Sequence, residues 1–133
     1  MTQTTLQMVL DKQEEFQTKL GFNRQMDLKE TIDLIHTHSS FINEEVIEML
    51  RELPYHKPWR DYSDWDAEKM NEQLQKAREE WIDVFIFLSN VGLFLGLDEN
   101  KIREMYLEKL GVNHERQENP ELGYIKSQSP TLV

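Results

Sequence analysis

The sequence contains no cysteine and only five glycines and four prolines among its 133 residues. Without cysteine the chain can form no disulfide framework, no thiolate metal site and no cysteine nucleophile. This composition fits a reducing compartment, and we expect a cytoplasmic protein. No stretch alternates between apolar and polar residues as a half-buried strand does, so the sequence gives no indication of a β-sheet.

Long apolar runs and an excess of positive charge are also missing. The most apolar stretch, 81–97, is 17 residues long and contains Asp83 and Asn90. A membrane span needs about 20 apolar residues and tolerates charge poorly, so this stretch is better interpreted as a buried core helix. The first eight residues are polar and do not resemble a signal peptide. The net charge of −10 argues against a nucleic-acid partner, because such binding requires a basic face.

Apolar residues recur instead with the 3.6-residue period of helices. The predicted helices cover residues 4–20, 27–53, 66–96 and 98–110. Gly21, Pro54 and Gly111 are the expected stops, and the polar segment 113–133 is expected to be extended or ordered only by contacts. We therefore predict an all-α fold, a helical bundle of four to five helices, with one domain over 1–124 and a polar tail over 125–133.

Two pairs of acidic residues have the same spacing on the two long predicted helices. Glu45 and Glu48 are three residues apart on one helix, as are Glu80 and Asp83 on the other. Residues at this spacing share a helix face, so the two carboxylates of each pair repel. Asp83 is the only charged residue between 81 and 95, which predicts that it is partly buried. A Mg²⁺ ion, which prefers oxygen ligands, would relieve both the repulsion and the burial of charge.

Other interpretations of these acids stay open. In a chain with 25 acidic residues, pairs at helical spacing arise by chance, and most such pairs are solvated. A carboxylate-bridged di-iron centre would require two Glu-x-x-His motifs, and none of the four histidines has a glutamate three residues before it. A non-catalytic acidic helical binding protein would scatter its acids over one exposed surface instead of bringing four of them together.

The succession of Glu-x-x-Glu and Glu-x-x-Asp resembles the all-α NTP pyrophosphatase superfamily, which includes MazG-like enzymes and dimeric dUTPases. Three further segments are similar to the dUTPase branch. The segment from Gln13 to Gln17 is like the family's Gln-x-x-Leu-Asn, and Pro58-Trp59-Arg60 is like its Pro-Trp-Lys. The segment 109–117, followed by Gly123-Tyr124, is like its Lys-Asn-x-x-Asn-x-x-Arg-Gln with Gly-Tyr. The resemblance spans about 6–124.

The resemblance implies a Mg²⁺-dependent enzyme that hydrolyses a deoxynucleoside triphosphate, above all dUTP, to the monophosphate and pyrophosphate. Such an enzyme cleanses the nucleotide pool and assembles as a homodimer or homotetramer. Its catalytic metal ligands would be Glu45, Glu48, Glu80 and Asp83, and Glu45 would also orient or deprotonate the attacking water.

The resemblance also implies which residues bind the substrate. Lys109 and Arg116 would bind phosphates, which suits their charge. The side chains that would line the nucleoside pocket are Gln13, Gln17, Trp59, Phe87 and Asn113. Five of these seven residues have a plainer interpretation: Trp59 and Phe87 as core, Gln13 and Gln17 as surface amides, and Lys109 as a partner of the helix dipole.

The sequence departs from the family pattern at several positions. Ile86 stands where the family often has histidine, Gln17 and Leu110 stand where it has asparagine, and extra residues precede Gly123-Tyr124. These changes fall on presumed base and sugar contacts, so they leave the nucleotide open and affect hydrolysis less. The alternative within the family is a MazG-like pyrophosphohydrolase for another or broader set of (d)NTPs.

Overall fold

The computed structural model describes residues 2–119 and 121, and this part of the chain contains four helices and no strand. The helices are α1 (Thr5–Lys19), α2 (Leu28–Glu52), α3 (Ala67–Phe94) and α4 (Glu99–Glu118). The all-helical class predicted from the sequence is confirmed. The chain divides into two units, Met1–Leu97 and Asp98–Val133, which are described separately. Gly123, Tyr124 and the predicted tail over 125–133 lie outside the described residues.

Short polar side chains begin every helix. Thr4, Asp27, Asp66 and Asp98 are the N-caps, and each side chain accepts a hydrogen bond from a backbone N–H in the first turn of its helix. Such a cap satisfies one of the donors that a helix start leaves without an intrahelical partner. The first residue of each helix therefore follows from local chemistry that is readable in the sequence.

Two of the helices end in the same glycine motif. At the end of α1, Gly21 has a φ of 107°, and the N–H of Phe22 donates to the carbonyl of Gln17 at 3.0 Å. At the end of α3, Gly96 has a φ of 76°, and the N–H of Leu97 donates to the carbonyl of Gly92 at 2.9 Å. A glycine enters this left-handed region without steric penalty, and the bonds satisfy carbonyls at the helix end.

The predicted end of the fourth helix is wrong. Gly111 was expected to stop it and 113–133 to be extended, yet α4 continues to Glu118. Gly111 does not have a positive φ, so it is an interior helical residue. A glycine inside a helix costs about 1 kcal/mol relative to alanine, which weakens a helix without ending it. The continuation places Lys109, Asn113 and Arg116 on one helix.

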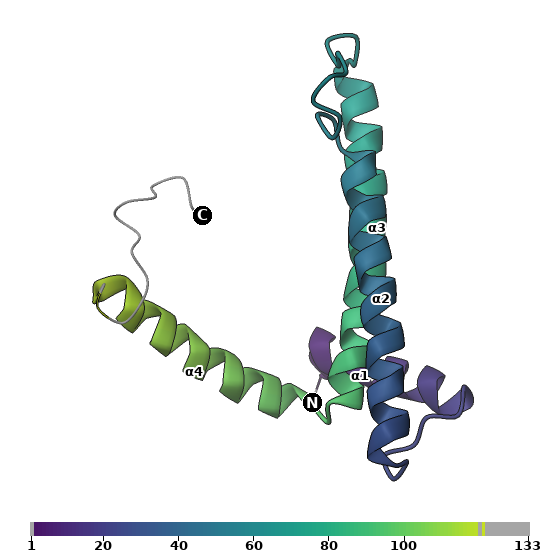
Figure 1. The fold of residues 1–133 in the computed structure, drawn as a ribbon, viewed down its shortest axis with the longest axis vertical. Coiled ribbons are helices and arrows are strands. Elements are labelled where there is room, and N and C mark those ends of the chain that lie inside the picture. The colour runs from purple at the N-terminus through teal and green to yellow at the C-terminus, as the bar shows by residue number, and fades with distance from the viewer. Residues whose placement is uncertain (1, 120, 122–133) are drawn as a thin grey trace. The chain divides into compact units, whose positions relative to one another are not determined.

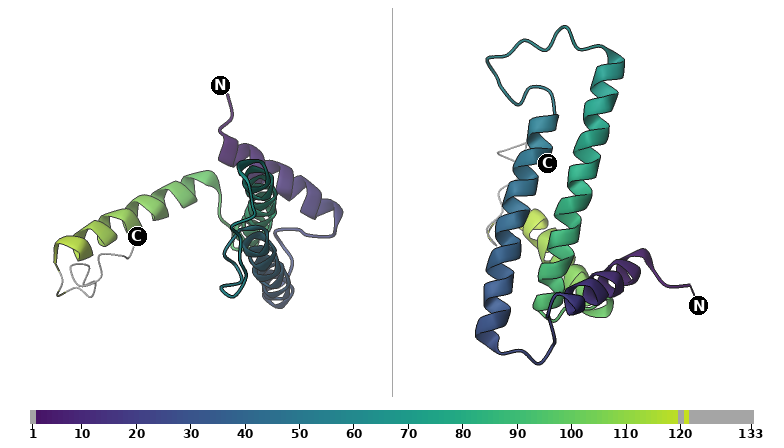
Figure 2. Two further views of the ribbon diagram at one scale, coloured as in Figure 1. Left: turned by 90° about the horizontal axis from the view of Figure 1, so that it is seen from above. Right: turned by 90° about the vertical axis from the view of Figure 1, so that its right-hand side faces the viewer.

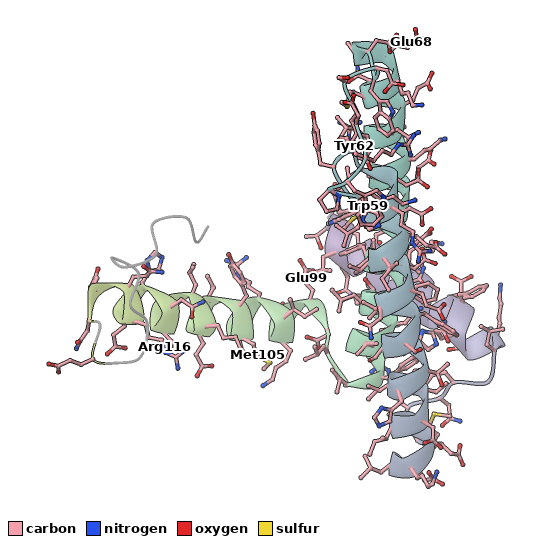
Figure 3. All side chains as sticks on the ribbon, turned by 45° about the horizontal axis from the view of Figure 1, so that its top comes forward. Trp59, Tyr62, Glu68, Glu99, Met105 and Arg116 are labelled. Carbon is pink, nitrogen blue, oxygen red and sulfur yellow. The ribbon has the colours of Figure 1, made fainter. Side chains whose placement is uncertain are left out.

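In the first unit, α2 and α3 form a long antiparallel hairpin, and α1 packs on α3 (Figures 1 and 2). The connection between α2 and α3 is the aromatic-rich segment 53–66, in which Figure 3 shows Trp59 and Tyr62. The core is densest where α1 reaches the C-terminal part of α3. There Leu10, Phe22, Leu93 and Phe94 are buried, and the rings of Phe22 and Phe94 are 5.1 Å apart.

Two polar residues lie inside this apolar core. Asn90 on α3 is only 2% exposed, and its Nδ2 lies 3.5 Å from Nδ1 of His38 on α2. Phe41, Phe87 and Phe94 surround the His38 ring with centroid distances between 4.9 and 5.8 Å. Burial lowers the pKa of His38, which favours the neutral ring. The pair links α2 to α3 inside the core, and Oδ1 of Asn90 is buried there without a hydrogen-bond partner.

No single helix of the described residues is long and apolar enough to cross a membrane. The pair of consecutive helices α3 and α4 reaches the required length and apolar composition only when the two are taken together across the bend at 95–98.

Candidate metal centre

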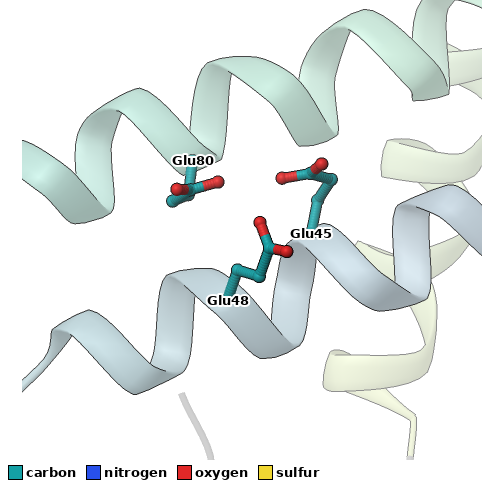
Figure 4. A group of neighbouring side chains, drawn as sticks. All are labelled: Glu45, Glu48 and Glu80. Carbon is teal, nitrogen blue, oxygen red and sulfur yellow. The ribbon is translucent and has the colours of Figure 1, made fainter.

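Three carboxylates from two helices converge midway along the hairpin. Glu45 and Glu48 project from α2 and Glu80 from α3, and one oxygen of each lies within 4.8 Å of the others. Figure 4 shows the three side chains pointing toward one another across the space between the facing helices. The i, i+3 spacing places the first two on one face of α2, as the sequence predicted. The antiparallel pairing with α3 then adds the third.

Glu45 has the most strained electrostatic environment of the three. The pKa of Glu45 is raised from 4.5 to about 7. The causes are its burial, hydrogen bonding with Glu80, the charge of Glu48 and hydrogen bonding with it, and the charge of Asp83. Burial is the largest of these causes, and each disfavours the ionised form. Oε2 of Glu45 is buried and has no hydrogen-bond partner. An orphaned carboxylate oxygen facing other carboxylates is suited to accept a cation.

Asp83 lies next to this cluster but outside the group that meets within 4.8 Å. It is half-buried, as its position in the apolar run predicted. Its charge contributes to the raised pKa of Glu45, so it adds negative potential at the site. Three of the four predicted acids are thus brought together, and the fourth acts on them through space.

The donor set fits a hard divalent cation. All the available ligand atoms are carboxylate oxygens, which Mg²⁺ prefers, and at most a few protein oxygens are needed because waters and phosphates complete its shell. A bound cation would offset the repulsion between the acids and would give Oε2 of Glu45 a partner. Exposed acidic groups are common without an ion, so the fit depends on this orphaned oxygen.

The predicted nucleoside-binding residues of the first unit have different environments. Gln17 on α1 is 5% exposed and Gln13, one turn earlier, is half-buried. Phe87 packs against His38 and Phe41 in the aromatic cluster of the core. Trp59 is 81% exposed in the connection between α2 and α3. Gln17 is thus covered by other side chains and Phe87 contacts rings of the core, whereas the exposed Trp59 indole has a face free to stack.

The predicted phosphate-binding residues lie together in the second unit. Lys109, Asn113 and Arg116 are spaced at i, i+4 and i+7 on α4, and they line a groove of about 540 Å³ with Met105, Glu108 and Val112. Figure 3 labels Met105 and Arg116 on this helix. None of the residues of α4 between 99 and 118 is buried. The helix thus places two cations and an amide along one stripe, in which Lys109 and Asn113 are exposed and Arg116 is half-buried.

Sequence reasoning did not identify the buried pair of His38 and Asn90. A signal was present for Asn90, which interrupts the apolar run 81–97, whereas His38 stands among the polar residues 36–40 and gave none. Comparison of the chain with protein-family models, curated proteins and solved structures gave no match.

Proposed function

We propose that this protein is a Mg²⁺-dependent pyrophosphohydrolase that converts a deoxynucleoside triphosphate, dUTP first among them, to the monophosphate and pyrophosphate. The observation that carries the proposal is the convergence of Glu45, Glu48 and Glu80 from two facing helices, with an orphaned buried oxygen on Glu45. The choice of substrate rests on the resemblance to the all-α NTP pyrophosphatases.

The proposed metal ligands are Glu45, Glu48 and Glu80, with Asp83 beside them. Magnesium, when bound there, supplies positive charge that offsets the charge on the substrate phosphates. The two helices contribute a fixed frame for these ligands, because the buried His38–Asn90 pair and the aromatic rings around it hold α2 against α3. Carboxylates held in advance need little rearrangement as charge develops.

In the proposed reaction, a water oxygen forms a bond to phosphorus as the phosphoanhydride P–O bond to the departing pyrophosphate breaks. Glu45 accepts the proton that this water loses, a role that its position among the other acids supports. Glu48, Glu80 and Asp83 keep the local potential negative, which strengthens Glu45 as a proton acceptor.

The substrate's phosphates are assigned to Lys109 and Arg116, and its nucleoside to Gln13, Gln17, Trp59, Phe87 and Asn113. The shared stripe of Lys109, Asn113 and Arg116 on α4 supports a joint role for these three. The open aromatic face of Trp59 supports stacking on a base.

A homodimer or homotetramer is part of the proposal. Large apolar side chains remain exposed on both helices of the hairpin, including Ile47 on α2 and Ile82 and Leu88 on α3. The side chain of Leu88 is 55% exposed. Association would bury such surface and stabilise a small core. Size-exclusion chromatography with light scattering measures the assembly, and a monomer at all concentrations would contradict this part.

The test of function is pyrophosphate release from a panel of dNTPs and NTPs, with Mg²⁺ and with EDTA. Release that requires Mg²⁺ and is fastest with dUTP supports the proposal. Fastest release from another nucleotide supports the MazG-like alternative with a different substrate. If no nucleotide releases pyrophosphate, the enzyme proposal is contradicted, and a non-catalytic acidic helical binding protein becomes the leading alternative.

A further inference from the structure

A second pocket lies at the end of the hairpin where α2 leads into α3. It has a volume of about 620 Å³, which is in the range of small-molecule sites. Its lining includes Arg51 on α2, Lys57 and Arg60 in the connection and Lys69 on α3. The other residues that line it are Leu53, His56, Tyr62, Trp65 and Gln73. We call this the hairpin pocket.

The charge of the hairpin pocket is opposite to that of the chain. The segment 51–73 contains six acidic residues, yet every ionisable residue that lines the pocket, apart from Tyr62, is a base or a histidine. The whole chain carries a net charge of −10. Four cations gathered in one concave site of such a chain create a local positive potential, and this potential attracts anions.

These cations have no ionic partner in the described part of the chain. None of the ion pairs among residues 2–119 involves Arg51, Lys57, Arg60 or Lys69. Their positive charge is therefore available to a ligand.

Aromatic rings hold two of the cations in place. The guanidinium of Arg60 lies 5.3 Å from the ring centre of Tyr62 and 5.9 Å from that of Trp65. The ammonium of Lys69 lies 4.8 Å from the ring centre of Trp65. Cation–π contact limits the motion of these side chains, so less entropy is lost when they bind an anion.

Trp65 adds a neutral donor. Its indole Nε1 is buried and has no hydrogen-bond partner. A buried N–H without an acceptor is unfavourable, and an anion oxygen in the pocket would satisfy it. Tyr62, whose hydroxyl accepts a hydrogen bond from the N–H of Lys57 at 3.2 Å, ties the connection into this arrangement.

We propose that the hairpin pocket binds an oligophosphate, the phosphoanhydride group shared by pyrophosphate and nucleoside polyphosphates. Arg51, Arg60 and Lys69 would contact the phosphate oxygens, because guanidinium and ammonium groups form charge-assisted hydrogen bonds with them. The site is distinct from the acidic cluster, whose ligands are carboxylates, and it goes beyond the proposed hydrolysis without depending on it. It needs no metal.

Titration of pyrophosphate into the full-length protein in EDTA, followed by calorimetry, tests the site. We expect Arg60→Gln combined with Lys69→Gln to weaken binding about tenfold or more, since two charge-assisted contacts are lost. The matched control removes two exposed cations of α3 outside the pocket, by Lys76→Gln with Arg78→Gln, and should bind as the wild type does. The indole N–H resonance of Trp65 should shift on binding in the wild type, whereas that of Trp81 should not.

Two further measurements separate this site from the acidic cluster and free pyrophosphate from a nucleotide as its ligand. Glu48→Gln should keep pyrophosphate binding in EDTA, which distinguishes this site from the acidic cluster and from any failure of hydrolysis. Comparing pyrophosphate with dUTP in that variant decides between free pyrophosphate and a nucleotide as the preferred ligand. If the double variant loses its helical circular dichroism, Arg51→Gln with Lys57→Gln replaces it. No binding, equal binding by pocket and control variants, or tighter binding of a single-stranded oligonucleotide would overturn the proposal.

Discussion

Glu45 on α2 and Glu80 on α3 bring carboxylate oxygens within 4.8 Å of each other across the hairpin, close enough for their charges to disfavour joint ionisation. Burial, Glu80 and the other acids around it raise the pKa of Glu45 to about 7, which favours its protonated form when no cation is bound. This relationship makes the metal-free site titratable near neutral pH. It also means that a cation and a proton compete for the same carboxyl group.

Removal of one charge from the acidic cluster, or from Asp83 beside it, should abolish turnover while leaving the helices intact. Glu48→Gln and Asp83→Asn should each reduce pyrophosphate release by about 100-fold or more, the scale of losing a preorganised electrostatic contact. Glu44→Gln is the matched control, because Glu44 is exposed on the same helix and outside the cluster. Retained turnover with unchanged circular dichroism in the cluster variants would disprove the assignment.

Stability without metal should depend on pH through Glu45. Between its ordinary pKa of 4.5 and its raised pKa of about 7, the folded chain holds a proton that the unfolded chain has released. The contribution of Glu45 to the free energy of unfolding therefore falls as pH rises through this window and is constant above it. Glu45→Gln cannot ionise and should lose this dependence.

Thermal unfolding in EDTA between pH 4.5 and about 7 measures this contribution of Glu45 to stability. The Tm of Glu45→Gln relative to that of the wild type should rise with pH, while the Tm difference for Glu44→Gln should stay flat. Parallel curves for the wild type and Glu45→Gln would show that Glu45 titrates normally in the folded chain.

Magnesium should raise the Tm, and more so above neutral pH. A ligand at about 100 times its Kd stabilises a folded protein by about 2.7 kcal/mol. Because Mg²⁺ must displace the proton of Glu45, its affinity should fall roughly tenfold for each pH unit below about 7. Calorimetric titration with Mg²⁺ on either side of neutral pH measures this, and Glu48→Gln should show little binding at either pH. A pH-independent affinity would place the ion elsewhere.

Arg116→Ala should weaken binding of a triphosphate roughly tenfold, as expected for loss of a hydrogen bond to a charged group. The measurement is calorimetric titration with a non-hydrolysable dUTP analogue and Mg²⁺. Arg103→Ala serves as the control, since Arg103 is an exposed arginine of α4 outside the groove lined by Arg116. Equal affinity of both variants would remove Arg116 from the substrate site.

Much of the secondary structure could be predicted because its causes are local. The aspartate caps at Asp27, Asp66 and Asp98 and the glycine ends at Gly21 and Gly96 act within a few residues of chain. The prediction that Gly111 ends the fourth helix was wrong. A glycine after an apolar helical stretch ends a helix only if the chain there adopts a positive φ, and Gly111 does not. Whether it does so depends on the residues after the glycine as well as on the glycine itself.

The candidate metal site was only partly predictable. The spacing of Glu45 to Glu48 and of Glu80 to Asp83 fixed each pair on one helix face. Asp83 stood out in the sequence because of its apolar neighbours, yet the strongest electrostatic perturbation falls on Glu45. The reason is that burial and charge at Glu45 come from across the hairpin, and sequence spacing carries no information about the facing helix.

The amino-acid sequence alone was enough for the helical class, three of the four helices and the pairing of acids within each long helix, because these depend on contacts a few residues apart. It took the packed fold to establish which acids meet, which of them has a raised pKa, and that Arg51 and Lys69 line one pocket. Those outcomes depend on the register in which α2 packs against α3, and that register is set by buried side chains distant in the sequence, among them His38 and Asn90.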